Sequence, residues 1–407
     1  MSIVPVAVYI NFPFCDGCNF CHDPKVSDVK SRMDNYVKAL INEIYSKKPQ
    51  DVKDTKGIQS IMFGGVGASF VAPKQIEKII KTLEEVFDIY PWTEITIECS
   101  PIAVTDENLH TWDKVGINRI SLALHSCDDL TLRILDKKYN VGEVYRALDS
   151  IAFYNENSLE DDLEDDMEPV FKINVDLTLG IPVTRDMSEM NLRRGSELEL
   201  AELLEKYPQI DHVSLYDLFV EDGTEMARQL SYEELYEQNA DAHVAEALLV
   251  RETLTKFGFS AYETYHWSRP GFECIYNQTH HEIENECYAF GAGATGLIEN
   301  VRYDNYENLD MYILSPDKAE HRAIRTNMEK INDTIINQLG TADGIDVVGL
   351  RKLGLDILLV RQHEIEHLKN MKLIKTTKNT LKMTKAGSLL VNYALSELLF
   401  DEEDLRS

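Results

Sequence analysis

The chain has 407 residues, and its 41 lysines and arginines against 70 aspartates and glutamates give a formal net charge of -29. Because nucleic acids and anionic membrane surfaces attract cationic proteins, this charge argues against either as the main partner and favours a small molecule. No apolar run approaches the roughly 20 residues that cross a bilayer, and the start MSIVPVAVYINF lacks a basic leader, so we expect a cytoplasmic protein. The length favours one large domain with a smaller companion.

Six runs rich in β-branched and aromatic residues alternate with helix-length amphipathic stretches in the first half of the chain. Such alternation predicts repeated βα units that form a parallel sheet. Six repeats favour an α/β fold with a partial (β/α)6 barrel of the TIM type, in which functional residues gather at the carboxyl ends of the strands. The expected strands are residues 6–12, 60–65, 94–99, 119–124, 171–180 and 212–219.

The alternation stops near residue 235, which divides the chain into three expected parts. Residues 1–235 form the barrel with its cysteine loop, and residues 236–317 form a long helix and a connecting segment that completes the site. Residues 318–407 end in a helix, two short strands around TKN and a helix, so we expect a smaller, mostly helical domain with a winged-helix outline. The acidic stretch NSLEDDLEDDMEP (157–169) is expected to be a solvated surface insertion.

Three of the seven cysteines lie close together in FPFCDGCNFCHDP, directly after the first expected strand. Cys15, Cys18 and Cys21 follow a C-x2-C-x2-C spacing, by which bacterial ferredoxins supply three thiolates to one [4Fe-4S] cluster. Lys25 stands where the next ferredoxin cysteine would be, so one iron stays open to an external ligand, as a catalytic cluster requires. Zinc is an alternative metal, although His22 as fourth ligand would crowd a tetrahedral site, and metal-free structural thiols are another alternative.

With these motifs the sequence resembles the radical S-adenosylmethionine (SAM) enzymes, and within them the oxygen-independent coproporphyrinogen III oxidases and their haem-chaperone relatives. The resemblance covers nearly the whole chain and implies a radical SAM barrel. It also implies a [4Fe-4S] cluster, SAM, a small-molecule substrate and a one-electron donor such as flavodoxin or ferredoxin. The matching motifs, in the family's order, are YINFPFC, NFC, FGGVGAS, ECSP, NRISLALHS, INVDLTLGIP, HVSLYDLFVEDGT, SRPG and LKMTKAG.

The resemblance further implies roles for individual residues. It makes Cys15, Cys18 and Cys21 the cluster ligands. Gly64 and Gly65 match the glycine-rich strand end that family members use for the methionine amino group. The other implied cofactor-binding residues are Tyr9, Phe20, Glu98, His125 and Asp176. Further matching positions are Arg119, Tyr216, Glu221 and Gly223.

The chemistry of these side chains suits such a cofactor. Gly64 and Gly65 allow the backbone to approach closely, the carboxylates of Glu98 and Asp176 accept hydrogen bonds from hydroxyl or amino groups, and the ring of Phe20 can stack on a flat base. Taken singly, the glycines are typical of a strand-to-helix turn and the acids of helix caps. Together with the three cysteines they favour a cofactor site.

Several positions depart from the family pattern. The family spacing is C-x3-C-x2-C, which is one residue longer than the spacing here. VGA (66–68) replaces a glycine and a threonine-proline pair, and His125 replaces a glutamine. Haem chaperones carry H-N-x-x-Y-W after SRPG, whereas this chain has YNQTHH (276–281) and keeps only Asn277.

Two functions follow from this comparison of motifs. We expect an enzyme that cleaves SAM to a 5'-deoxyadenosyl radical and abstracts hydrogen from a tetrapyrrole or a small molecule; no catalytic side chain is assigned. The alternative is a haem chaperone. A haem iron needs an axial ligand such as histidine, and the nearest candidates to the missing motif are His280 and His281.

A separate motif, HEIEH (363–367), fits the zinc-protease pattern H-E-x-x-H, in which two histidines one helical turn apart bind the metal. No third ligand is evident in the sequence. A surface helix explains the pattern equally well, with Ile365, Leu368 and Met371 facing inward and the histidines facing water.

Overall fold

A computed structural model describes residues 6–14, 18–22, 30–48, 57–160, 169–182, 195–237, 240–283 and 285–401. Cys15 and most of the acidic stretch 157–169 lie outside the described residues. Within the described part of the chain, no helix is both long enough and apolar enough to cross a membrane.

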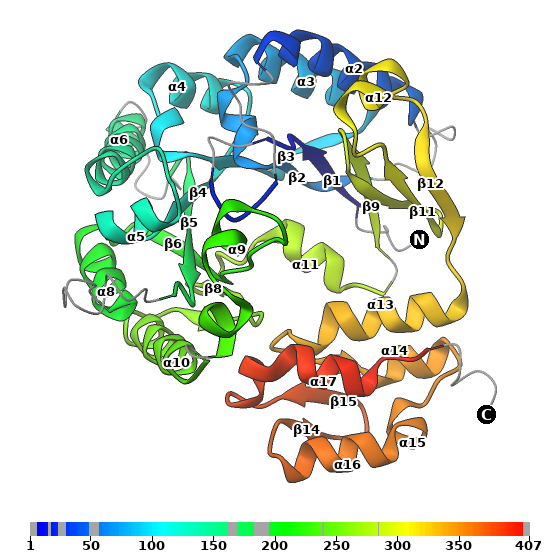
Figure 1. The fold of residues 1–407 in the computed structure, drawn as a ribbon. Coiled ribbons are helices and arrows are strands. Elements are labelled where there is room, and N and C mark those ends of the chain that lie inside the picture. The colour runs from blue at the N-terminus through cyan, green and yellow to red at the C-terminus, as the bar shows by residue number, and fades with distance from the viewer. Residues whose placement is uncertain are drawn as a thin grey trace.

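Six parallel strands form the centre of the molecule, and helices surround them on the outside (Figure 1). The partial barrel predicted from the alternating pattern is therefore confirmed. The strands are β1 (Val6–Asn11), β2 (Ile58–Gly64), β3 (Ile89–Cys99), β4 (Arg119–His125), β5 (Lys172–Leu179) and β6 (Ile210–Asp217). The outer helices are α2 (Met33–Ser46), α3 (Pro73–Val86), α4 (Asp106–Lys114), α5 (Asp129–Ile134), α6 (Val141–Glu160), α8 (Ser196–Lys206) and α10 (Ala240–Lys256).

The sheet continues beyond these six strands on both sides, which the sequence pattern does not predict. On one side β9 (Glu286–Phe290) runs parallel to β1, followed by three antiparallel strands. On the other side β8 (His266–Ser268) and β7 (Ser260–Ala261) continue from β6. Within the described residues the sheet has 12 strands and includes β10 (Thr295–Ile298), β11 (Val301–Asn305) and β12 (Ala319–Ile324). Short helices in this region are α9 (Glu225–Gln229), α11 (Ile275–His281) and α12 (Leu309–Leu314).

Strand side chains alternate between two environments. In β1, Val8 and Ile10 are buried in the core that the strands share with the outer helices, whereas Tyr9 and Asn11 point to the inside of the barrel. The burial of apolar side chains between strands and helices is the main force that holds the barrel together. It leaves the inner face free to carry polar residues.

The last part of the chain has a separate core. Its three-stranded sheet, with order β13-β15-β14, packs against helices, and its first helix begins with a capping box between Thr326 and Glu329. Because β12 still pairs with β11, this unit begins at α13. Its elements are α13 (Asn327–Leu339), β13 (Ile345–Asp346), α14 (Val347–Lys352), α15 (Ile357–Val360), α16 (Gln362–Asn370), β14 (Ile374–Thr376), β15 (Thr380–Met383) and α17 (Val391–Leu398). The hairpin around TKN in a mostly helical unit agrees with the predicted winged-helix outline.

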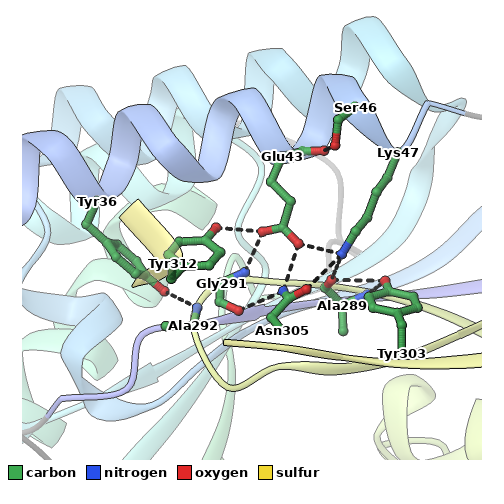
Figure 2. Close-up of polar contacts among 10 residues, drawn as sticks. All are labelled: Tyr36, Glu43, Ser46, Lys47, Ala289, Gly291, Ala292, Tyr303, Asn305 and Tyr312. Carbon is green, nitrogen blue, oxygen red and sulfur yellow. Dashed lines mark hydrogen bonds and ion pairs between the residues drawn. The ribbon is translucent and has the colours of Figure 1, made fainter. Parts of the chain in front are cut away.

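A buried polar network joins α2 to the extended side of the sheet (Figure 2). The carboxylate of Glu43 is fully buried and accepts hydrogen bonds from Lys47 Nζ at 2.5 Å, Tyr312 OH at 2.5 Å and Gly291 N at 2.9 Å. In the same cluster the hydroxyl of Tyr36 donates to the carbonyl oxygen of Asn11 at 2.5 Å. The network therefore fixes the carboxyl end of β1, where the cysteine loop begins.

Candidate functional site

Strand register brings polar residues from four neighbouring strands into one row inside the barrel. Glu98 of β3 pairs with Ser121 of β4, Ser121 pairs with Asn174 of β5, and Asn174 pairs with His212 of β6. Residues that pair across a sheet point to the same face, so these four side chains share the barrel interior. Asp176 lies two residues beyond Asn174 and therefore faces the same way.

Glu98 contacts the glycine-rich turn after β2. Its Oε2 accepts a hydrogen bond from the backbone N–H of Gly65 at 2.6 Å. The pKa of Glu98 is raised to about 7, chiefly by burial and then by the nearby carboxylate of Asp176, while the Gly65 hydrogen bond and Arg119 act in the opposite direction. Glu98 is therefore poised between its charged and neutral forms near neutral pH.

The turn at Gly65 leaves no space for a side chain. The φ angle of Gly65 is 78°, and a Cβ at this position would lie 2.3 Å from the carbonyl oxygen of Phe12. A Cβ on Gly64 would lie 2.2 Å from the ring of Tyr9. Glycine is required here because the strand ends of β1 and β2 are in direct contact.

Asp176 is held in a fixed orientation by its neighbours. Its Oδ1 accepts from Asn174 Nδ2 at 2.7 Å and its Oδ2 accepts from Ser121 Oγ at 3.1 Å. Burial raises the pKa of Asp176, although these hydrogen bonds and the charge of Arg119 counteract the effect. The motifs in the sequence predict a role for Asp176 but none for Asn174 and Ser121. The alternation of polar residues in INVDL and RISLAL was the signal that could have identified them.

His125 and Phe20 lie farther along the same edge. His125 ends β4 with a φ of 60°, which is unusual for a residue with a side chain, and its Nδ1 lies 2.9 Å from Thr178 Oγ1. Burial lowers the pKa of His125 well below its usual value. The ring of Phe20 packs beside a small apolar cluster that includes Leu218 and Met226. Both residues therefore lie near strand ends, as expected.

The cysteine loop is anchored to the segment that follows β6. The backbone N–H of Glu221 donates to the carbonyl oxygen of Phe20 at 2.9 Å, and that of Met226 donates to Asn19 at 2.9 Å. In return the N–H of His22 donates to the carboxylate of Glu221 at 2.8 Å. These contacts place residues 18–22 across the carboxyl ends of the strands, close to α9.

The sulfur atoms of Cys18 and Cys21 lie together in this loop. The structure pairs them as a disulfide, with 6.4 Å between their Cα atoms. Once reduced, two thiolates this close can bind neighbouring iron atoms of one cluster, and thiolate is the ligand that iron-sulfur clusters require. The described cysteines therefore fit the predicted cluster, whereas the role of Cys15 stays a prediction.

Helix α11 fills the end of the barrel opposite the cysteine loop. It contacts β1, β2 and α13 (Figure 1). Glu94 Oε1 accepts from the N–H of Ile275 at 2.9 Å and from the thiol of Cys274 at 3.4 Å, and this caps the helix. The ring of Tyr276 lies 6.0 Å from that of Tyr9. Residues 276–281, which stand where haem chaperones carry H-N-x-x-Y-W, therefore close this end of the barrel.

His280 and His281 both have partners at the end of α11. His281 Nε2 lies 2.5 Å from a carboxylate oxygen of Glu263, and the ring of His280 packs edge-on against that of Tyr276 at 4.7 Å. Burial lowers the pKa of His280 to about 4, so this imidazole is neutral near pH 7.

The HEIEH motif lies far from these residues, on α16. Its two histidines are exposed, and His367 Nε2 lies 3.0 Å from the hydroxyl of Tyr393. Ile365 and Leu368 are buried as expected, but Met371 is 44% exposed because the helix has already ended at Asn370. Within the described ranges, no group of three or more histidines, cysteines or acids is arranged to hold a metal.

Comparisons with known proteins agree with this geometry. Residues 12–155 match the family model described as the radical SAM superfamily. The matched residues include the cysteine loop, Gly65, Glu98 and His125, so the predicted family resemblance is confirmed, and it implies a [4Fe-4S] cluster and SAM as cofactors.

Similar proteins extend the similarity beyond residues 12–155. Heme chaperone HemW from Lactococcus lactis subsp. lactis (strain IL1403) is 25% identical over 403 residues, which is 98% of either chain. HemW from Synechocystis sp. is 28% identical over 312 residues, 74% of this chain and 68% of that protein. The solved structure of coproporphyrinogen III oxidase (HemN) from Escherichia coli superposes with a TM-score of 0.76 at 19% identity, over 97% of this chain and 90% of that chain. That structure shows the same fold.

Proposed function

We propose that this chain binds a [4Fe-4S] cluster and SAM at the carboxyl ends of the barrel strands and cleaves SAM to act on a tetrapyrrole or another small molecule. The observation that carries the proposal is the pair of half-buried acids, Glu98 and Asp176, on the inner face of the barrel strands. Their electrostatic coupling and the hydrogen bond from Gly65 to Glu98 create acceptors for a cationic, hydroxyl-bearing ligand.

The proposed roles follow from the chemistry of each group. Cys15, Cys18 and Cys21 would hold the cluster, which when bound supplies one-electron chemistry to SAM. Glu98, in its ionised form, would accept from the amino group of SAM, with the backbone of Gly64 and Gly65 close by. The remaining cofactor contacts are proposed for Tyr9, Phe20, His125 and Asp176.

Asp176 and Phe20 would orient the nucleoside part of the cofactor. The carboxylate of Asp176 is held by Asn174 and Ser121, so it can accept from a ribose hydroxyl without reorienting. Phe20 offers an apolar face at the rim of the barrel. The electron would come from a protein such as flavodoxin or ferredoxin, which accords with the cytoplasmic location that we propose.

Haem delivery is the second candidate function. The observation that favours it is the similarity to HemW over 98% of either chain. The arrangement of α11 favours the enzyme, because His281 already pairs with Glu263 and Tyr276 stands where the haem-chaperone motif has histidine. Neutral His280 is the side chain best suited to bind haem iron.

A paired experiment separates the two functions. Anaerobically reconstituted protein is reduced, incubated with SAM and candidate tetrapyrroles, and assayed for 5'-deoxyadenosine; haem is then titrated and the Soret band followed. We expect 5'-deoxyadenosine and no tight haem complex. Cys18→Ala should abolish the iron chromophore and SAM cleavage, whereas Cys127→Ala, a matched change outside the loop, should leave both intact.

Two results would contradict this proposal. Zinc in place of iron, or iron retained in Cys18→Ala, would exclude the cluster assignment. Stoichiometric haem binding that is lost in a His280→Gln/His281→Gln variant, without cleavage of SAM, would establish the chaperone instead.

A further inference from the structure

A continuous series of hydrogen bonds crosses the barrel from α11 to Asp176. The residues in it, which we call the His212 chain, are Asn277, Tyr262, His212, Asn174 and Asp176. Asn277 Nδ2 lies 3.2 Å from the hydroxyl of Tyr262, and that hydroxyl lies 2.7 Å from His212 Nε2. His212 Nδ1 lies 2.5 Å from Asn174 Oδ1, and Asn174 Nδ2 lies 2.7 Å from Asp176 Oδ1.

The direction of each hydrogen bond is determined by the chemistry of Asn174. Its amide nitrogen donates to Ser121 Oγ at 2.7 Å and to the Asp176 carboxylate, so its oxygen must be the acceptor that faces His212. A flipped amide would place this oxygen against the carboxylate of Asp176. Nδ1 of His212 must therefore carry a proton and donate it to Asn174.

The other ring nitrogen of His212 is then an acceptor. Burial lowers the pKa of His212 well below its usual value, with further lowering by Arg119 and His266, so the ring is neutral and Nε2 has no proton. It accepts from the hydroxyl of Tyr262, whose oxygen in turn accepts from Asn277. Every link thus has one donor and one acceptor.

Burial makes the His212 chain difficult to rearrange. Asn174 is 1% exposed and His212 is 2% exposed. In such surroundings, loss of one donor leaves a polar atom without a partner, and water cannot easily replace it. A change at one end of the chain is therefore transmitted to the next member.

We propose that the His212 chain makes Tyr262 and His212 positioning residues for the cofactor, and so links the seating of α11 to the orientation of Asp176. This inference rests on the proposed SAM site. Tyr262 and His212 act through Asn174 and need no contact with SAM. An occupant of the barrel that displaces Asn277 would thereby weaken SAM binding. Helix α11 in its present position would strengthen SAM binding.

Removal of one hydroxyl tests the proposal. Tyr262→Phe leaves Nε2 of His212 without a donor, so the imidazole loses one of the two hydrogen bonds that fix its orientation against Asn174. We expect SAM to bind roughly 3- to 10-fold more weakly in equilibrium dialysis of the anaerobic holoprotein, the effect of one hydrogen bond. Cluster content should not change. Tyr265→Phe is the matched control, because the hydroxyl of Tyr265 bonds to Asn392, which is not part of the His212 chain.

Substitution of the imidazole separates positioning from packing. His212→Asn keeps an N–H near the Nδ1 position, whereas His212→Leu keeps more of the volume but has no donor. We expect His212→Asn to bind SAM more tightly than His212→Leu. If His212 serves only to fill space, the order should be reversed.

A double variant tests whether the residues act through one route. If they do, Tyr262→Phe combined with His212→Leu should bind SAM no more weakly than His212→Leu alone. Additive losses, or unchanged affinity in Tyr262→Phe, would overturn the inference. Wild-type affinity for SAM is measured first, so failure of the proposed function itself would be recognised before any variant is compared.

Discussion

The titration of Glu98 is the most direct link between a single residue and a measurable property of the site. Its pKa of about 7 means that the carboxylate loses its charge as the pH falls through neutrality. A cationic amino group binds an ionised acid more tightly than a neutral one. The affinity for SAM should therefore increase with pH and level off above about pH 7.

We predict that SAM binds roughly tenfold more tightly at pH 8 than at pH 6, which is the change in the ionised fraction of a group with a pKa near 7. In Glu98→Gln the affinity should be lower and flat over this range. The dissociation constant is measured by equilibrium dialysis at several pH values. His125 does not confound the result, because its pKa lies well below 6.5. A profile in Glu98→Gln as steep as the wild type's would exclude this carboxylate.

How far single residues could be predicted depended on whether the family resemblance implies a role for them. It implies roles for the cysteines, Glu98 and Asp176. Asn174 and His212 lie within matching motifs but have no implied role there, and Tyr262 lies outside the motifs. Their importance appears only when strand register brings β5 and β6 together and Tyr262 bonds to His212. The sequence pattern places Asn174 and His212 on the polar faces of two different strands, but it does not show that the two side chains form a hydrogen bond.

At the scale of elements, the strands that were predicted are those with the strongest local signal. β1 to β6 contain runs of β-branched residues because helices cover one of their faces. β7 has only two residues and β10 contains Gly296, while β12 (AEHRAI) is almost wholly exposed, so none of them shows an apolar pattern. These strands form because they pair with an existing sheet edge, which is information from tertiary structure.

The turn from β2 into the next helical segment gives the second prediction. Gly65→Ala would combine a positive φ with a Cβ only 2.3 Å from the carbonyl oxygen of Phe12. Gly271→Ala is a matched control, because Gly271 has a φ of 87° and nothing within 4 Å of the added Cβ. The control isolates the backbone strain, which is about 1–2 kcal/mol.

We predict that urea unfolding will show a loss of about 1–2 kcal/mol for Gly271→Ala and a larger loss for Gly65→Ala, since the steric clash adds to the strain. SAM binding should fall only in Gly65→Ala, because that turn also donates to Glu98. Equal losses of stability in the two variants would show that the contact with Phe12 is easily relieved.

At the scale of the whole molecule, the buried network around Glu43 joins parts of the chain that are far apart in sequence. Glu43 belongs to α2 and Lys47 is its C-cap, whereas Gly291, Asn305 and Tyr312 follow more than 240 residues later (Figure 2). Lys47 also bonds to the carbonyl oxygen of Ala289 and lies 3.8 Å from the centre of the Tyr303 ring. Helix α2 is thereby locked to the strands that extend the barrel beyond β1.

Burial determines what a substitution in this network will do. Removal of one member of a buried ion pair leaves the other charge without compensation, and this typically costs about 3–5 kcal/mol. Burial already lowers the pKa of Lys47, which Glu43 counteracts. When Glu43 is lost, the lysine must either lose its proton or draw water into the core.

We therefore predict that Glu43→Leu will lower the free energy of unfolding by about 3–5 kcal/mol in urea titrations. The double variant Glu43→Leu/Lys47→Met should recover much of this loss, because no charge then stays buried. A surface pair of the same spacing, Lys81 with Glu77, provides the control, and Glu77→Leu should change stability by less than about 1 kcal/mol. If Glu43→Leu proves as mild as Glu77→Leu, the network does not hold α2 to the sheet.

The same network should also affect the cysteine loop, because Tyr36, which belongs to it, bonds to Asn11 at the end of β1. A destabilised network should loosen this loop. We therefore predict that Glu43→Leu will lose its iron-sulfur cluster to a chelator faster than the double variant does.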